Sequence, residues 1–355
     1  MTKTFLPLFC VSAVSAILVT GCKGPEKTVA VNGEAWPATL NYAYSPSTED
    51  PEARVLTLNE RVKYLSDYIG IPVRLYETSS YGPTIEAMRS GKVDIATTGS
   101  FSFMIAAEKV GVEPLTLLGY RNEDGTVEPG SNYSVIAVPP DSPIHSVEDL
   151  KAHASELTFS FSDAASTTGH LLPRDGLQQM GIDPDQDFKR VVFTQSHLNS
   201  IMTIIAGKVD AGGIQEGAIQ RLIDTGKIKE GDLKIIWRSE AFLRPPLMVR
   251  GELPRSLKEK IRSAYLEMDQ RDPELFAAIQ SRYSSYYPPG MVYVPVYDYM
   301  WDNMRLIAKR LKNMKLIEGK TGISDWNEEK RQEFLQQQAA KQEQVSVELA
   351  SLSHT

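Results

Sequence analysis

A short repeat constrains the fold of this chain more than any other feature of its sequence. The segment Gly-Lys-Val-Asp-Ile-Ala at residues 91–96 recurs as Gly-Lys-Val-Asp-Ala-Gly at residues 207–212, which is a displacement of 116 residues. In each copy the glycine ends a predicted helix and a strand follows it. Repeats of solenoid proteins are roughly 20–50 residues long, so this long period predicts two similar lobes instead.

Predicted strands and helices alternate around both copies of the repeat. Apolar strand patterns occur before and within each copy, with helical patterns between them, at residues 40–44, 72–76, 93–97, 157–161, 191–194 and 209–214. This alternation is typical of an α/β fold in which a mostly parallel sheet is flanked by helices. A chain of 355 residues is long enough for two such domains.

A polar aromatic residue stands ten residues before each repeated glycine, Tyr81 in the first copy and His197 in the second. Each opens a predicted helix, after Ser80 and Ser196 as candidate N-caps. Ligands of such sheets bind beyond the carboxyl ends of the strands. We therefore expect Tyr81 and His197 on opposite walls of one cleft between the lobes.

The chain divides into two lobes joined by two crossing strands. The crossings are predicted at Tyr133–Pro139 and Leu247–Gly251. The expected parts are a signal segment (1–21), a flexible tether (22–38), lobe one (39–135 with 250–320), lobe two (136–249) and a C-terminal helical tail (321–355). The thin apolar stripe of the tail indicates that it either frays or pairs with a second copy as a homodimer.

The N-terminus has the pattern of an export signal. Lys3 precedes a mostly apolar run of 15 residues, Phe5–Val19, which is too short to span a bilayer as a helix. Val19-Thr20-Gly21-Cys22 resembles the lipobox of bacterial lipoproteins, and the alternative is a short anchor with a chance Gly-Cys. We predict removal of Cys10, lipidation of Cys22, and a protein anchored to the membrane on the periplasmic side of the bacterial cell envelope.

Three consecutive hydroxyl residues mark a candidate anion site. Ser166, Thr167 and Thr168, followed by Gly169, come between a strand and a helix whose start Pro173 fixes near residues 167–170. Free N–H groups, the positive end of the helix dipole and the hydroxyls converge there. Ordinary helix capping is the alternative for this segment, and it is the more frequent explanation for the weaker analogue that contains Thr98.

Several function classes are disfavoured or lack their motifs. The sequence has no phosphate-binding loop, no dinucleotide glycine motif and no serine nucleophile elbow, and its five histidines lack metal-ligand spacing. Ser166 and His197 could imitate a nucleophile and its base, but no carboxylate is placed to complete a triad. We predict a non-enzyme without cofactor or metal. A net charge of −7 also argues against nucleic acid as a partner.

These residues together resemble the phosphonate, phosphite and phosphate-binding component of bacterial ABC transporters, within the two-lobed periplasmic binding proteins. The resemblance rests on segments within residues 39–315: Tyr81–Arg89, Lys92–Ala96, Ser166–Gly169 with Pro173, His197, and Lys234–Trp237. The resemblance implies that the hydroxyl turn binds a phosphorus oxyanion and that Tyr81 and His197 bind the same ion. It also implies that Asn132 or Tyr133 contributes a ligand-binding side chain from the crossing strand.

Departures from the family pattern narrow the expected ligand. Members that take aminoalkylphosphonates use carboxylates to receive the ammonium group, and Gly217 and Pro245 stand at those positions here. A shift of one residue would bring Glu216 there instead. The resemblance therefore favours phosphite, methylphosphonate or phosphate, delivered to an ABC permease. Helix dipoles could receive such an ion without a cationic surface, so the acidic net charge is no obstacle.

Two alternatives of the same fold remain at this stage. One is a sensing lipoprotein that presents its closed form to a signalling receptor. The other is a binding protein for a sulfonate, a sulfate or a thiamine precursor, which would use the same hydroxyl turn.

Overall fold

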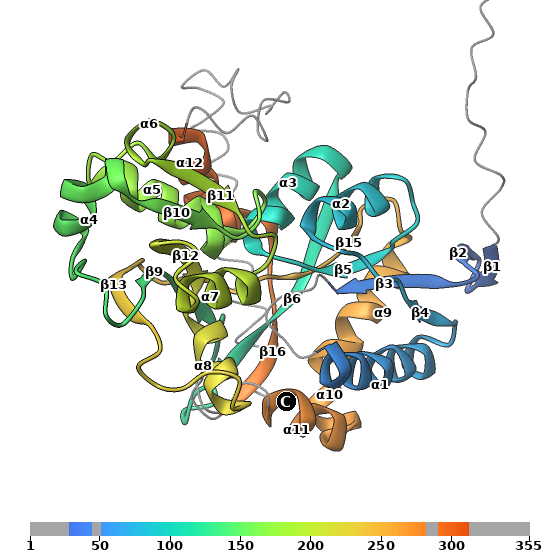
Figure 1. Cartoon of the computed structure of the whole chain (residues 1–355). Coiled ribbons are helices and arrows are strands. Elements are labelled where there is room, and N and C mark those ends of the chain that lie inside the picture. Colours follow the sequence, from blue (N-terminus) through green and yellow to red (C-terminus); the bar gives the residue numbers. More distant parts are fainter. Residues whose placement is uncertain (1–27, 45–50, 282–289, 312–355) are drawn as a thin grey trace, which may run out of the picture.

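The computed structural model describes residues 28–44, 51–281 and 290–311. The predicted signal segment, the lipidation site Cys22 and the C-terminal tail at 321–355 lie outside these ranges. The described chain forms two α/β lobes, each built on its own sheet (Figure 1). No helix in the described ranges combines the length and the apolar character needed to cross a membrane.

The first lobe contains a seven-stranded sheet with β7 (Val127–Glu128) paired to β6 at its edge. The other strands run in the order β16 (Met291–Pro295), β6 (Val112–Arg121), β15 (Leu247–Arg250), β5 (Ile95–Thr97), β3 (Leu40–Tyr44) and β4 (Val73–Leu75). Its helices are α1 (Pro51–Ile69), α2 (Tyr81–Arg89), α3 (Ser100–Val110), α9 (Arg255–Leu266), α10 (Met268–Arg271) and α11 (Pro273–Ser281).

The second lobe contains a five-stranded sheet. Its order is β11 (Arg190–Phe193), β10 (Thr158–Phe161), β12 (Ala211–Gln215), β9 (Ser134–Val138) and β13 (Lys234–Arg238). The helical segments are α4 (Val147–His153), η1 (Ala154–Glu156), η2 (Thr167–Leu171), α5 (Leu172–Gln179), α6 (Pro184–Asp187), α7 (His197–Ile205) and α8 (Glu216–Asp224).

The two sheets share one strand order, which is the structural form of the sequence repeat. The order β4-β3-β5-β15-β6 in lobe one matches β11-β10-β12-β9-β13 in lobe two. The repeated aspartates make equivalent hydrogen bonds in the two lobes. Asp94 accepts from the backbone N–H of Asn41, and Asp210 accepts from that of Thr158. Gly91 and Gly207 each adopt a positive φ, 70° and 62°, after α2 and α7.

Each sheet is mixed, whereas the sequence predicted a mostly parallel arrangement. Three strands are parallel in each lobe, and a strand arriving from the other half of the chain inserts antiparallel beside them, β15 against β5 and β9 against β12. The insertion also shifts the lobe boundary, since residues 247–249 belong to the sheet of lobe one. The crossing itself is a two-stranded pair, β8 (Ser131–Asn132) with β14 (Phe242–Leu243).

The predicted tether is wrong for residues 28–37, which form an antiparallel hairpin of β1 (Thr28–Val31) and β2 (Glu34–Pro37). Asn32 and Gly33 make the turn with φ values of 48° and 83°, the conformation that the Asn-Gly pair favours in hairpins. Trp36 is buried against lobe one, and its Nε1 donates to Ser256 Oγ at 3.1 Å.

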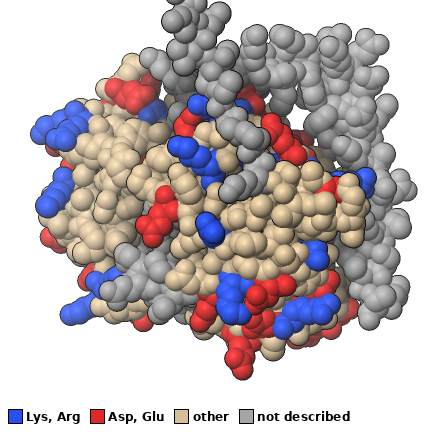
Figure 2. Space-filling view, turned by 90° about the vertical axis from the view of Figure 1, so that its right-hand side faces the viewer, with Lys and Arg blue, Asp and Glu red and all other residues tan. Residues whose placement is uncertain are grey.

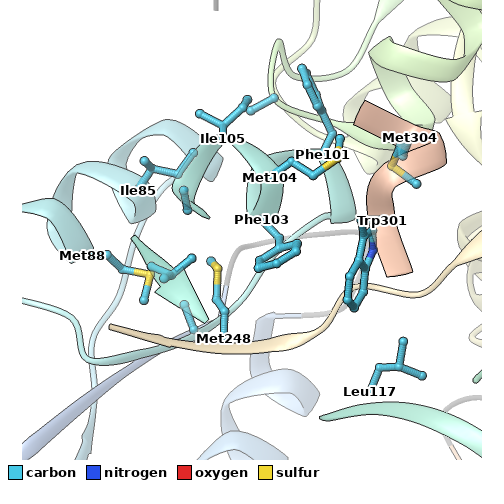
Figure 3. Packing of buried hydrophobic residues seen from close by; sticks show 14 of the residues in the cluster. Ile85, Met88, Phe101, Phe103, Met104, Ile105, Leu117, Met248, Trp301 and Met304 are labelled. Carbon is cyan, nitrogen blue, oxygen red and sulfur yellow. The ribbon is translucent and has the colours of Figure 1, made fainter. Parts of the chain in front are cut away.

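The C-terminal described segment connects the core of lobe one to lobe two. In η3 (Asp298–Trp301) and α12 (Asp302–Arg310), Trp301 and Met304 are buried beside Phe103 of α3, whose ring centroid lies 4.9 Å from that of Trp301 (Figure 3). Ala165 and Leu171 of lobe two belong to the same cluster. The lobes are therefore packed together.

The face in Figure 2 shows acidic and basic side chains interspersed around a broad uncharged area. Among the described residues visible there, basic side chains form no continuous patch.

Candidate binding site between the lobes

A cavity of about 130 Å³ lies between the lobes, where helix N-termini of both lobes meet. Its lining includes Tyr81 at the start of α2, Gly99 before α3, Thr167 at the start of η2 and His197 at the start of α7. The positive ends of the helix dipoles therefore face one space. Such a space favours a small anion.

A widened helical turn presents the predicted hydroxyl residues. Leu171 N bonds to Ser166 O across five residues, which makes η2 a π-helical turn ahead of α5. Pro173 has no N–H to give to the Gly169 carbonyl, and Ser162 N donates to that carbonyl at 2.9 Å instead. A Cβ on Gly169 would lie 1.5 Å from Ser162 Oγ, so only glycine fits this turn.

The hydrogen bonds of His197 define its tautomer. The backbone N–H of Gln215 donates to His197 Nδ1 at 3.3 Å, so that nitrogen carries no proton. Nε2 must then carry the proton of the neutral ring, and it lies 3.2 Å from Thr168 Oγ1 and 3.4 Å from Ser166 Oγ. His197 is therefore placed as a donor beside the hydroxyls of the turn.

Burial keeps two ionisable groups of this site, His197 and Tyr81, in their uncharged forms. Burial, with a smaller contribution from Arg221, lowers the pKa of His197 to about 3. Burial raises the pKa of the Tyr81 phenol, and the nearby Asp163 carboxylate acts in the same direction. Both groups thus stay hydrogen-bond donors at neutral pH.

Two contacts across the cleft hold the lobes closed. Phe101 N, in the first turn of α3, donates to Thr167 Oγ1 at 2.8 Å. The Asp163 carboxylate accepts from the backbone N–H groups of Ala165 and Tyr81, so lobe two caps α2 of lobe one. This explains why Ser80 makes no side-chain capping bond, while its counterpart Ser196 caps α7 as predicted.

The structure brings all but one of the predicted site residues to the cavity. The lining includes Tyr81, Thr98, Asn132, Ser166, Thr167, Thr168 and His197. Tyr133 is the exception, because its ring packs under the Arg238 guanidinium, 3.5 Å from the centroid. Arg238 in turn makes two hydrogen bonds of 2.7 Å to Glu216. Of the two candidates on the crossing strand, Asn132 is the one that lines the cavity.

Three arginines that the sequence analysis missed also line the cavity, so helix dipoles are not its only positive groups. Arg244 is used structurally, donating to the carbonyls of Leu118 and Ser131 and to the Tyr120 hydroxyl. Arg221 donates to Gln215 Oε1 at 3.1 Å. The described residues that line the cavity include no Asp or Glu.

The third arginine, Arg61, had a recognisable signal in the sequence. It stands on the apolar face of α1, three residues after Leu58 and four before Leu65, both of which are buried. A cation at a core position of an amphipathic helix is unusual unless it has a partner.

Solved structures share this two-lobed fold. A Pseudomonas aeruginosa binding protein component of an ABC phosphonate transporter aligns with a TM-score of 0.67 at 24% identity, covering 89% of this chain and 97% of that one. PhnD1 of Prochlorococcus marinus, solved with methylphosphonate, aligns with a TM-score of 0.65 at 19% identity, covering 78% of this chain and 99% of that one.

Two curated relatives are similar in sequence. The Phosphate-import protein PhnD of Mycolicibacterium smegmatis is 25% identical over 263 residues, 72% of this chain and 80% of its own length. The Phosphonates-binding periplasmic protein of Escherichia coli K12 is 29% identical over 206 residues, 58% of this chain and 59% of its own length. A family model for the periplasmic phosphonate-binding protein of ABC transporters matches residues 44–288, well over half of the chain. The chain therefore belongs to the family of phosphonate periplasmic substrate-binding proteins of ABC transporters.

Proposed function

We propose that the chain captures phosphite, methylphosphonate or phosphate, in preference to an aminoalkylphosphonate, and delivers it to an ABC permease while anchored by a lipid on Cys22. Family membership makes it a periplasmic, substrate-binding component of an importer and not an enzyme. The observation that carries the finer proposal is the cavity lining, which joins hydroxyl donors with the imidazole N–H of His197 and includes no carboxylate among the described residues.

The geometry suits an oxyanion with several acceptor atoms. Thr167, Thr168 and the Nε2–H of His197 can each donate to a different oxygen, and Tyr81 can donate from the opposite lobe. These groups are preorganised around the cavity, so they replace the hydration shell of the ion when the lobes close.

An ammonium group on the ligand has no counter-ion in this lining. The nearest sequence candidate, Glu216, is engaged by Arg238, and Pro245 occupies a lining position. Burying an unpaired ammonium is costly, and nearby arginines add like-charge repulsion. An aminoalkylphosphonate is therefore disfavoured. The names of two relatives, one a phosphate importer and one solved with methylphosphonate, are consistent with this choice.

Isothermal titration calorimetry tests the proposal with phosphite, methylphosphonate, phosphate, aminoethylphosphonate and sulfate. We expect one of the first three to bind tightest. Thr167→Ala or His197→Ala should weaken that ligand by about 1–3 kcal/mol, roughly 5- to 150-fold, because a buried oxyanion loses a donor. Ser142→Ala, in a turn of lobe two outside the cavity lining, is the control.

Three results would contradict the proposal. Tightest binding of aminoethylphosphonate would refute the ligand preference. Unchanged affinity in both the Thr167 and the His197 variants would refute the site. Tightest binding of sulfate would favour the sulfate alternative of the same fold.

A further inference from the structure

Arg61 is buried in the lobe-one wall of the cavity, and none of the acidic residues that the structure describes is paired with it. The residue is 7% exposed, and it comes from α1, which has no part in the helix N-termini described above. Within the described residues its guanidinium makes one hydrogen bond, from Nη1 to the Tyr42 hydroxyl at 3.2 Å, and its buried Nε donates to nothing. A guanidinium has five N–H donors, so most of its capacity is unused.

The groups that face Arg61 are tyrosines. Tyr42, Tyr44, Tyr265 and Tyr293 surround it, and its guanidinium carbon lies 5.8 Å from the centroid of the Tyr44 ring. No Asp or Glu of the described chain forms a salt bridge with it. An unpaired buried charge costs several kcal/mol in real proteins, which is why buried arginines normally have a carboxylate beside them. Arg61 therefore lacks a counter-anion that its position calls for.

Arg61 lies close to the proposed oxyanion site without being part of it. The Tyr42 hydroxyl that receives its hydrogen bond is also 3.3 Å from Thr97 Oγ1, and Thr97 precedes the lining residues Thr98 and Gly99. The same cavity thus reaches from the hydroxyl turn of lobe two to the Arg61 wall of lobe one. Thr116 Oγ1, another lining atom of lobe one, is likewise buried without a hydrogen-bond partner.

The size of the cavity permits a ligand with two ends. One water needs roughly 10–15 Å³ of such space, so about 130 Å³ exceeds what the few heavy atoms of methylphosphonate fill. A second group at the Arg61 end would meet a cation with free, planar donors. A carboxylate matches the planar geometry of a guanidinium, because it can accept two parallel hydrogen bonds from it.

We propose that Arg61 forms a second anion subsite, and that the cavity also accepts a phosphonate whose carbon chain ends in a carboxylate, with higher affinity than the matching alkylphosphonate. This proposal rests on the proposed function, since it assigns the tail of a ligand whose phosphorus head occupies the hydroxyl turn. It makes the cavity favour a phosphonate with a second acidic group over one with an uncharged tail.

Calorimetry with matched ligands tests the subsite. The probes are phosphonoacetate and 3-phosphonopropionate, against ethylphosphonate and propylphosphonate as uncharged tails, with methylphosphonate as the head alone. We expect one carboxylate ligand to bind at least about tenfold tighter than its alkyl counterpart, because a charged pair forms in a dry site. Arg61→Met should abolish this difference and leave methylphosphonate affinity within about threefold.

Control variants separate the subsite from general effects. Arg262→Met removes another lobe-one guanidinium, which lies outside the cavity lining and pairs with Glu259, and it should keep the full preference. Arg61→Gln retains a hydrogen-bond donor for Tyr42. It replaces Arg61→Met in the same titrations if circular dichroism shows that the Arg61→Met protein is unfolded. The comparison of carboxylate and alkyl ligands on the unmodified protein needs no variant.

The outcomes distinguish this inference from the proposed function. If methylphosphonate binds but a carboxylate tail gives no advantage, the subsite is refuted and the proposed function stands. If the advantage persists in Arg61→Met, Arg61 is not the subsite. If no phosphorus oxyanion binds at all, the proposed function fails and this inference fails with it.

Discussion

Two buried histidines each accept a hydrogen bond on one ring nitrogen. Gln215 N donates to His197 Nδ1, and Arg174 Nε donates to His170 Nε2 at 3.0 Å. His170 donates from Nδ1 to the Ala164 carbonyl at 2.8 Å. Burial is the main cause that lowers the pKa of His197 to about 3 and that of His170 to about 4. Both rings therefore resist protonation in the folded protein.

This depression of the pKa values predicts acid sensitivity. An unfolded histidine titrates near 6.5, so the stability from these two neutral rings is present above about pH 6.5 and lost as pH falls toward 3–4. Between pH 5.5 and 4.5 each ring should cost on the order of 1.4 kcal/mol of unfolding free energy per pH unit. Urea unfolding at several pH values measures the slope.

The matched variants His170→Gln and His197→Gln isolate these contributions. Each variant should reduce the pH dependence of the unfolding free energy by the contribution of one protonating ring, about 1.4 kcal/mol per pH unit. The carboxylates contribute equally in the two variants and the unmodified protein. An unchanged slope in both variants would mean that the histidines are charged in the folded protein.

Among the helices and strands, those around the sequence repeat were predicted best. Helix α2 and helix α7 begin at Tyr81 and His197, and strands β5 and β12 follow the repeated glycines. The π-helical turn was not predictable from a pattern, because it depends on Ser162 reaching Gly169 from a preceding strand. The Asn32-Gly33 pair indicated the hairpin at 28–37. The docking of Trp36 on lobe one was not predictable, because its hydrogen-bond partner Ser256 is distant in the sequence.

Helix α12 belongs to the core of lobe one and also contacts lobe two. Arg310 donates two hydrogen bonds to Asp175 of α5, at 2.9 and 2.6 Å (the two helices lie side by side in Figure 1). Asp175 is buried, with 6% of its side chain exposed, whereas 55% of the Arg310 side chain is exposed. The pair is therefore partly screened by solvent.

Loss of this pair should favour the open arrangement of the lobes. Arg310→Gln is expected to raise the radius of gyration of the ligand-free protein in small-angle X-ray scattering. Its ligand affinity should fall by up to about fivefold, since such pairs contribute up to ~1 kcal/mol. Arg305→Gln, whose partners Asp298 and Asp302 lie in the same C-terminal segment, is the control. Identical scattering and affinity in both variants would contradict the role of Arg310 in closure.

For the whole molecule, anion binding depends on where the charges lie and not on the net charge. The chain carries a net charge of −7, yet three arginines line its cavity and no described lining residue is acidic. The net charge is a sum over all charged residues, so it could not reveal a cavity lined by arginines. The hydroxyl turn, Tyr81, His197 and Asn132 were predictable from local motifs and resemblance. The unusual position of Arg61 on the apolar face of α1 was readable in the sequence, but the convergence of Arg61, Arg221 and Arg244 on one cavity was not, because helix α1, helix α8 and the β14 crossing meet only in the folded chain.

We infer that the two lobes close on one ion. Each lobe supplies part of the lining, Tyr81 and Thr98 from one and Ser166–Thr168 with His197 from the other, so the ligand is removed from water only when both are in place.

A crystal structure of the protein with methylphosphonate would test this closure. We expect phosphonate oxygens within hydrogen-bond distance of Thr167, Thr168 and His197 Nε2, with Tyr81 contacting the same ion from lobe one. A phosphonate bound elsewhere, or bound in the cavity to residues of one lobe alone, would contradict it.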